Sequence, residues 1–132
     1  MIGVDTNVLV RHFVGDDQVQ AAIATRYLSE RTESDPAFVS AAVICELVWV
    51  LKRFYGYADA KVHEALHSLF ESSNIVIERM ELLHLAIGAA HEANADISDA
   101  IIAALAADAG ATKTVTFDKV AAKRIPAMEL LA

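Results

Sequence analysis

The chain has 132 residues, a length that suits one domain able to bury a core without disulfides or structural metal. Hydrophobic residues make up 55% of it, more than such a domain can bury, which predicts a face that binds another protein. The formal net charge of −7 disfavours a simple nucleic-acid binder, because such proteins usually carry a basic face, unless several carboxylates share one bound cation.

Apolar periodicity and capping residues predict strands that alternate with helices. The expected strands are residues 2–4, 37–39, 74–78, 113–116 and, as an edge strand, 128–131. The expected helices are residues 16–31, 40–55, 59–72, 81–94, 98–110 and 120–124. Ser40, Asp59 and Ser98 are the expected caps of three helices, and Gly56 is expected to end the second. The alternation predicts a parallel sheet covered by helices on both faces, with residues 1–132 as a single domain.

Three features bear on the cellular compartment. No apolar run approaches the roughly 18 residues that span a bilayer, so no membrane association is expected. The first residues, MIGVDTN, lack the basic and apolar regions of a secretory signal. The single cysteine, Cys45, lies in an apolar run and can form no intrachain disulfide. We therefore expect a protein of the reducing cytoplasm.

Two aspartates follow predicted strands. Asp5 ends the first strand, and Asp118 lies just past the strand at 113–116. In parallel sheets ligands bind beyond the carboxyl ends of the strands, which places both carboxylates at the expected binding site. Each aspartate could equally cap the segment that follows it, because aspartate is favoured at helix starts.

Glu46 lies inside the apolar run 41–51. A carboxylate buried there would lose its hydration unless it found a cation or hydrogen-bond donors. A metal ion would supply that partner, and so would an ion pair with Lys52 or Arg53.

Asp96 and Asp99 form a third acidic feature, three residues apart at the start of a predicted helix. This spacing puts both on one helix face, where the helix dipole favours negative charge. Capping explains one of the two readily, but it explains both less well because Ser98 is the expected cap.

The acidic residues together predict a site for a divalent cation. A hard cation takes several oxygen ligands, and a cluster of acids without histidine suits Mg²⁺ or Mn²⁺ better than Zn²⁺. Such ions activate water and stabilise the charge that develops in phosphoryl transfer.

Four ordered segments resemble PIN-domain proteins, and among these the VapC-type toxins of toxin–antitoxin pairs. The segments are VDTNVLVR, SAAVICELVWVLKRFYG, DISDAIIAALAADAGA and TVTFDKVAAK. The resemblance covers nearly the whole chain. It implies a three-layer α/β/α fold with a central, mainly parallel sheet of four to five strands, and cleavage of RNA with Mg²⁺ or Mn²⁺.

The resemblance also assigns roles to residues and implies partners. Catalytic, metal-site roles fall on Asp5, Glu46, Asp99 and Asp118, with Asp5 and Asp99 as the first choices for direct ligands. Supporting roles fall on Asp96, Thr6, Asn7 and Thr116. The implied partners are RNA, a small cognate antitoxin that neutralises the toxin, and a second copy of the chain in a homodimer. Because the family includes RNA-binding members, a non-catalytic RNA-binding PIN domain is the alternative.

Residues 63–67 read HEALH and match the H-E-x-x-H pattern of zinc proteases. In that interpretation His63 and His67 bind zinc and Glu64 is the general base. The same residues also fit a solvated helix face, and no further residue stands out as the third ligand.

Basic residues near the acidic segments could bind phosphates. The candidates are Arg11, Lys52, Arg53, Lys119 and Lys123, with Arg124 beside the last. Each also fits solvated surface charge. Trp49, Tyr55 and Tyr57 could stack on bases, although core or dimer contacts explain them equally well.

Overall fold

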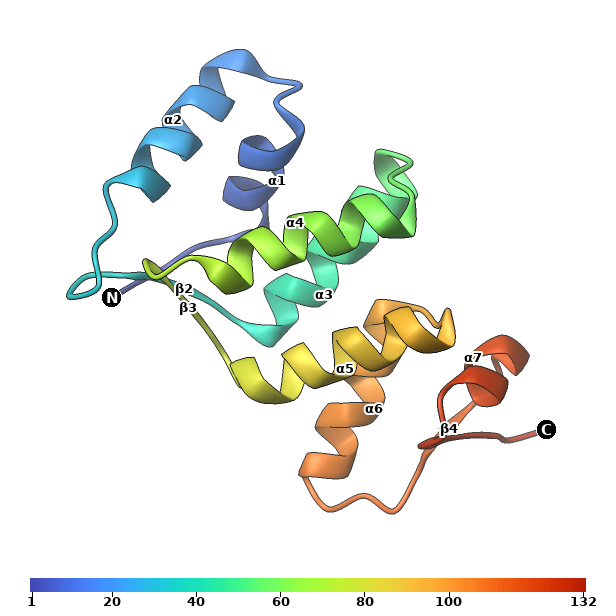
Figure 1. The fold of residues 1–132 in the computed structure, drawn as a ribbon. Coiled ribbons are helices and arrows are strands. Elements are labelled where there is room, and N and C mark those ends of the chain that lie inside the picture. Colours follow the sequence, from blue (N-terminus) through green and yellow to red (C-terminus); the bar gives the residue numbers. More distant parts are fainter. The chain divides into compact units, whose positions relative to one another are not determined.

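The computed structural model describes all 132 residues and divides into two compact units, Met1–Met80 and Glu81–Ala132. The first unit contains β1 (Ile2–Gly3), α1 (Thr6–Val14), α2 (Gln18–Ser29), β2 (Ala37–Val39), α3 (Ala41–Trp49), the π-helical turn η1 (Val50–Phe54), α4 (Asp59–Glu71) and β3 (Ile75–Ile77) (Figure 1). The second contains α5 (Met80–Ala93, beginning at the boundary), α6 (Ile97–Asp108), β4 (Thr114–Thr116), α7 (Lys119–Arg124) and β5 (Met128–Leu130).

The first unit is built on a three-stranded parallel sheet in the order β1-β2-β3. Ile2 pairs with Ala37, and Phe38 pairs with Val76. The central strand is the most buried, since Ala37 and Val39 have no exposed surface. Because the strands are parallel, the residues that follow them lie at one edge of the sheet, where ligands bind in such folds.

The cores of the two units are aliphatic. In the first unit the fully buried side chains include Leu9, Ile44, Leu47, Leu51 and Leu66. In the second they include Leu83, Ile97 and Ile101, and β4 pairs with β5 in parallel, with Thr114 opposite Met128. Burying one such side chain stabilises a fold by about 1.5–3 kcal/mol. None of the helices combines the length and apolar character needed to cross a membrane.

The expected α/β class is confirmed: all five predicted strands form, and every strand pair is parallel. The expected single sheet of four to five strands differs from what is observed, because the strands form one three-stranded and one two-stranded sheet. Hydropathy locates a strand, but the pairing of its edges depends on residues far away in the sequence.

Several predicted helix starts were wrong. Helix α1 was not predicted, because valine and phenylalanine are frequent in TNVLVRHFV and favour helices only weakly. Helix α2 starts after Asp17 rather than at Asp16. Ala58 occupies the capping position of α4, with Asp59 inside the first turn. The Ser40 cap is confirmed, and Gly56 adopts φ +68° where the α3–η1 segment ends.

Candidate functional site

Asp5 links the end of β1 to the start of α1. Its carboxylate accepts a 2.8 Å hydrogen bond from the backbone N–H of Thr6, so it caps the helix. The Asp5 side chain is exposed, as is that of Asn7, whereas Thr6 is 3% exposed. Capping thus holds the Asp5 carboxylate at the carboxyl edge of the sheet, with oxygen surface left for a ligand.

Glu46 lies on the exposed face of α3, which corrects the expectation that it is buried. The exposed positions recur as Ala42, Glu46, Trp49 and Arg53, one face of the α3–η1 segment. The buried positions of the same apolar run face the core, so high average hydropathy did not imply burial of every residue. Glu46 makes no hydrogen bond or ion pair, and Lys52 pairs with Asp59 at 2.8 Å. The predicted alternative of an ion pair with Lys52 or Arg53 is not formed.

Asp96, rather than Ser98, caps α6. The Asp96 carboxylate accepts a 3.0 Å hydrogen bond from the backbone N–H of Asp99, and the helix begins at Ile97. The expected Ser98 cap was wrong because aspartate two residues earlier fills that role. Asp96 and Asp99 are both half-buried, and capping accounts for Asp96 while leaving the Asp99 carboxylate in the first turn.

Asp118 repeats the arrangement seen at Asp5. It follows β4 and caps α7, where one carboxylate oxygen accepts hydrogen bonds of 2.9 Å from the N–H groups of Val120 and Ala121. The N–H of Asp118 donates to the hydroxyl oxygen of Thr116 at 3.0 Å, which fixes the turn between strand and helix. Asp118 is exposed. The same local design therefore ends both strands: an aspartate that caps the next helix.

The four candidate acids divide between the units. Asp5 and Glu46 belong to the first, and Asp99 and Asp118 to the second. The structure does not bring three or more His, Cys, Asp or Glu side chains together as a metal site, so convergence of the four acids stays a prediction. The donors themselves fit a hard cation, because all are carboxylates and none is histidine or thiolate.

Comparison with protein-family profiles gives a match over nearly the whole chain. The profile of the PIN domain matches residues 2–127. The chain belongs to the PIN-domain family. That membership identifies it as a protein of the nuclease class, in which metal dependence is common, and agrees with its α/β architecture. No curated protein gives a significant match.

The HEALH segment of this PIN domain lies on α4. His67 faces Glu71 one turn on, with 3.3 Å between Nε2 and Oε1, while His63 is half-buried. No third ligand gathers with the two histidines. The family match and this geometry leave the zinc-protease interpretation without support.

Arg11 is part of a polar network rather than a solvated cation. Its guanidinium donates to Gln20 at 2.7 Å, to Asp16 at 3.1 Å and to the Tyr55 hydroxyl at 3.4 Å. Tyr55 in turn donates to Asp16 at 2.9 Å. The hydrogen bond from Tyr55 and then the charge of Arg11 lower the pKa of Asp16, and the bond to Tyr55 together with nearby carboxylates raises the pKa of Arg11. This network joins the α1–α2 loop to the end of η1.

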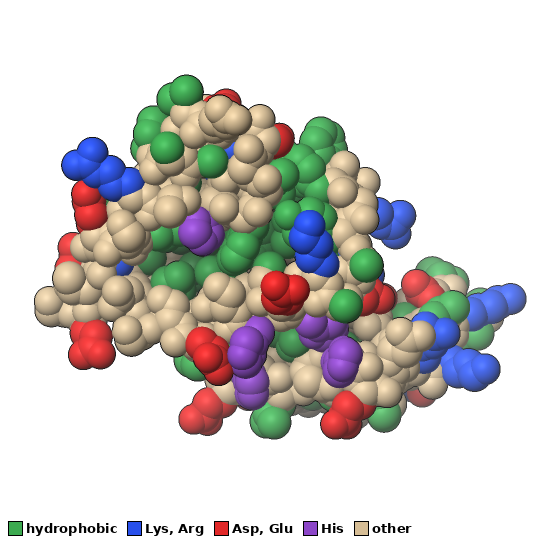
Figure 2. Space-filling model, turned by 45° about the horizontal axis from the view of Figure 1, so that its top comes forward, with side chains coloured by type: hydrophobic (Ala, Val, Ile, Leu, Met, Phe, Trp, Pro, Cys, Tyr) green, Lys and Arg blue, Asp and Glu red, His purple; other side chains and the backbone are tan.

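The other basic candidates differ in their contacts. Lys119 and Lys123 are exposed on α7 and have no partner, and Arg53 has none either. Arg124 donates to the carbonyl oxygen of Asn94 at 2.6 Å. In the view of Figure 2, Lys and Arg side chains gather around α7 and are otherwise dispersed.

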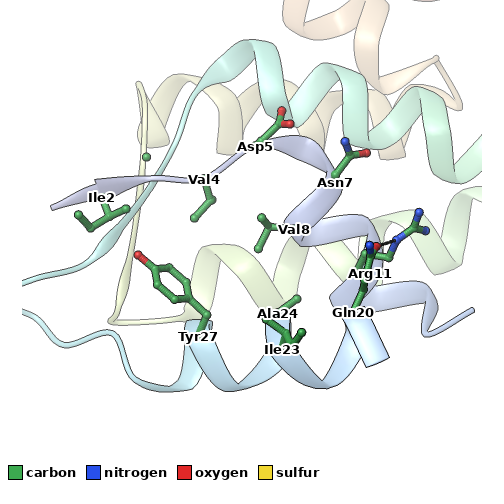
Figure 3. A pocket seen from close by; sticks show the side chains of 11 residues that line it. Ile2, Val4, Asp5, Asn7, Val8, Arg11, Gln20, Ile23, Ala24 and Tyr27 are labelled. Atoms are coloured by element: carbon green, nitrogen blue, oxygen red, sulfur yellow. Dashed lines mark hydrogen bonds between the residues drawn. The ribbon is translucent and has the colours of Figure 1, made fainter. Parts of the chain in front are cut away.

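An apolar cavity of about 550 Å³ lies between α1 and α2, next to Asp5. In Figure 3, Val4 and Val8 point into it from one side and Ala24 from α2 on the other, with Asp5 and Asn7 at the start of α1. The hydrogen bond between Arg11 and Gln20 lies at one end. This cavity was not predicted from the sequence, although the apolar residues Val19 and Ile23, one turn apart on α2, were a usable signal.

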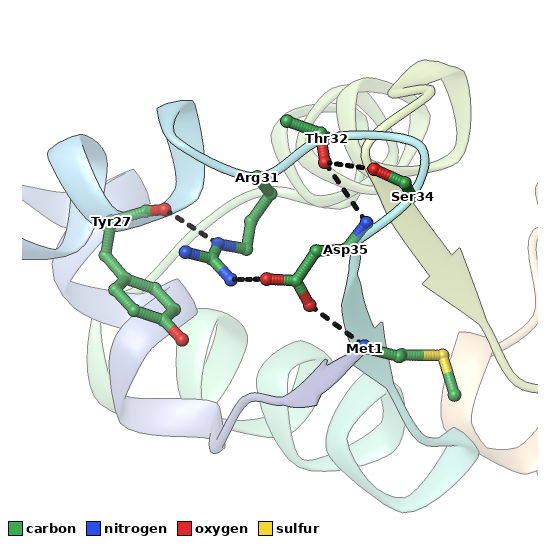
Figure 4. Close-up of polar contacts among 6 residues, drawn as sticks. All are labelled: Met1, Tyr27, Arg31, Thr32, Ser34 and Asp35. Carbon is green, nitrogen blue, oxygen red and sulfur yellow. Dashed lines mark hydrogen bonds and ion pairs between the residues drawn. The ribbon is translucent and has the colours of Figure 1, made fainter.

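A second polar network anchors the chain that follows α2 (Figure 4). Arg31 donates to the carboxylate of Asp35 at 3.0 Å and stacks 4.3 Å above the ring of Tyr27, which lines the cavity. The amino group of Met1 donates to the other carboxylate oxygen of Asp35 at 2.9 Å. This hydrogen bond, together with the charges of the amino group and of Arg31, lowers the pKa of Asp35. Asp35 thus connects Arg31, which follows α2, to Met1, which precedes β1.

Proposed function

We propose that this PIN domain is an Mg²⁺- or Mn²⁺-dependent endoribonuclease. The observation that carries the proposal is the shared setting of Asp5 and Asp118, each at the carboxyl end of a parallel strand and at the start of a helix. In parallel α/β proteins ligands bind beyond the carboxyl ends of the strands, and a carboxylate at such a strand end is an oxygen ligand of the kind that a hard divalent cation takes. The family match adds the nuclease class.

In this proposal residues 1–132 act as one nuclease domain, and four carboxylates hold the cation. Asp5 and Asp99 are direct ligands. Glu46 and Asp118 complete the set, at least one of them through water. When bound, the cation lowers the pKa of its water and so supplies a hydroxide nucleophile at neutral pH.

The neighbouring residues keep the carboxylates in place. Thr6 gives its backbone N–H to Asp5, and Thr116 accepts the N–H of Asp118. Asp96 fixes the backbone of Asp99. Asn7, exposed in the first turn of α1, is the candidate to hydrogen-bond an RNA phosphate or a bound water. Loosening any of these contacts is expected to reduce activity without removing a metal ligand.

RNA binding is proposed to use the unpaired cations. Lys119 directly follows Asp118, Lys123 lies one turn further along α7, and Arg53 shares the exposed face of Glu46. These positions put positive charge next to the proposed acids, where it can bind the RNA backbone. Arg11 and Lys52 already have carboxylate partners within the chain and are weaker candidates.

A toxin role in the cytoplasm, with an antitoxin and a homodimer as partners, is the finer proposal. Large apolar side chains are exposed, and Figure 2 shows hydrophobic side chains on the surface of the molecule. They include Val19, Ile23, Trp49, Phe54, Leu85 and Ile102. An amphipathic antitoxin segment seated in the cavity between α1 and α2 could place a basic side chain next to Asp5 and block the site.

The nuclease proposal is tested with purified full chain and single-stranded RNA. We expect cleavage that requires Mg²⁺ or Mn²⁺ and disappears in Asp99→Asn. Glu33→Gln is the matched control, because Glu33 is exposed and has no partner. If the wild type binds RNA without cleaving it at any tested divalent concentration, the non-catalytic RNA-binding alternative is correct.

The toxin proposal has a separate test in cells. Expression of the chain alone is expected to arrest growth, and Asp5→Asn is expected to relieve the arrest at an unchanged protein level. An Asp5→Asn variant as toxic as the wild type would show that the arrest does not come from the proposed site.

A further inference from the structure

A second, smaller cavity lies within the first unit, between the end of α1 and α4. Its volume is about 240 Å³, which accommodates a single planar base. The lining residues are Phe13, Tyr57, Lys61, Glu64, Ala65 and Ser68. It therefore combines two aromatic rings with a cation, a carboxylate and a hydroxyl, and it is distinct from the apolar cavity beside Asp5.

One face of α4 supplies the polar groups of this cavity. Lys61, Glu64 and Ser68 recur at positions i, i+3 and i+7, so they line up along the helix. The Lys61 ammonium lies 4.1 Å from the centre of the Tyr57 ring, a contact that holds both side chains at the cavity wall. Glu64 and Ser68 make no hydrogen bond or ion pair within the chain. Their oxygens are available to a ligand.

We propose that this cavity binds a guanine base of the RNA substrate, an inference that rests on the proposed ribonuclease function. The Watson–Crick edge of guanine presents one acceptor, O6, followed by two adjacent donors, N1–H and the 2-amino group. Lys61 can donate to O6 while the two oxygens of Glu64 accept from N1–H and the amino group. Adenine, cytosine and uracil lack two adjacent donors on that edge, so none of them satisfies the Glu64 carboxylate in the same way.

The aromatic residues complete the complementarity. Single-stranded RNA is commonly recognised by bases that stack on aromatic rings and hydrogen-bond along their edges. Phe13 is half-buried and lines the cavity. Phe13 also fixes the distance to the proposed metal site, because Asp5 caps the same helix eight residues earlier. At 1.5 Å per residue this is about 12 Å, so the guanine would lie within a few nucleotides of the cut.

The test measures binding without cleavage, using the full-length Asp99→Asn variant and short fluorescent oligouridines that carry one guanine, adenine or inosine. We expect about tenfold tighter binding of the guanine strand than of the adenine strand, with a partial loss for inosine, which lacks the 2-amino group. Glu64→Gln in the same background is expected to remove the preference. Glu71→Gln, two turns further along α4 and outside the cavity, is expected to keep it.

Equal affinity for the guanine and adenine strands, or a guanine preference that survives in Glu64→Gln, would overturn the proposal. Neither result would bear on cleavage by the wild type, so the nuclease proposal would stand. Conversely, a Glu64-dependent guanine preference in a chain that never cleaves RNA would overturn the nuclease proposal and leave the base-binding cavity in place.

Discussion

Glu78, at the end of β3, accepts a 2.8 Å hydrogen bond from the backbone N–H of Ala41, the first residue of α3. Ser40 accepts from Val43 at the same helix end, so two N–H groups that lack helical partners are satisfied from different parts of the chain. This contact fixes the start of α3 to the third strand of the sheet. Because α3 carries Glu46, Glu78 is a positioning residue for that proposed ligand.

Removing this contact is expected to destabilise the first unit. Glu78→Ala should lower the free energy of unfolding by about 1 kcal/mol, the usual cost of a lost helix cap. Glu78→Gln keeps an oxygen that can accept the same bond and should retain most of the stability. Urea unfolding followed by circular dichroism measures the difference, with Glu33→Ala as the surface control. Equal losses in the Ala and Gln variants would contradict the role of this hydrogen bond.

His12 predicts a pH dependence of stability. Its ring is half-buried, 2.8 Å from the Thr25 hydroxyl, and burial lowers the pKa of His12. The unfolded chain, with an ordinary histidine pKa of about 6.5, therefore binds the proton more readily. This contribution to stability is complete above about pH 6.5 and is lost as the pH falls from there through the lowered pKa of the folded state.

The measurement is urea unfolding at pH 5 and pH 8 for the wild type and His12→Gln. The wild type should lose more stability than the variant on going to pH 5, because glutamine takes up no proton. Identical pH dependence in the two proteins would show that the His12 proton does not differ between the folded and unfolded states.

Much of the fold was predictable because it depends on local patterns. Short runs of apolar or β-branched residues located the strands, and Ser40 was identified as a cap from its place before an apolar helix. Helix α1 was missed because its β-branched and aromatic residues favour strands in isolation, whereas tertiary packing of Leu9 and Val10 stabilises the helix. The division of the strands between two sheets depends on long-range pairing, which periodicity does not contain.

The candidate acids show the same contrast. The positions of Asp5 and Asp118 at strand ends followed from sequence, and the structure confirms the capping role that the sequence also allowed for each. Glu46 was expected to be buried because its neighbours are apolar, but its neighbours along the helix face are exposed. Asp96, not Ser98, caps α6. Both residue types are good helix caps, so the sequence spacing alone did not decide between them.

The chemistry of cleavage yields a prediction about the products. The acidic segments contain no histidine pair of the kind that activates a 2′-hydroxyl, so water is the expected nucleophile. In-line attack by water expels the 3′-oxygen and leaves a 5′-phosphate and a 3′-hydroxyl. Mass spectrometry should find these ends, and a substrate with 2′-deoxyribose at the cut site should still be cleaved. A 2′,3′-cyclic phosphate product would exclude attack by water.

Mn²⁺ titration of the full chain, followed by electron paramagnetic resonance, measures whether Asp5, Glu46, Asp99 and Asp118 hold one divalent cation. We expect Mn²⁺ binding to weaken in each of the variants Asp5→Asn, Glu46→Gln, Asp99→Asn and Asp118→Asn. The loss should be about tenfold or more for the proposed direct ligands Asp5 and Asp99, while Glu33→Gln should bind Mn²⁺ like the wild type. Undiminished Mn²⁺ affinity in Asp5→Asn or Asp99→Asn, with the fold intact by circular dichroism, would contradict this shared metal site.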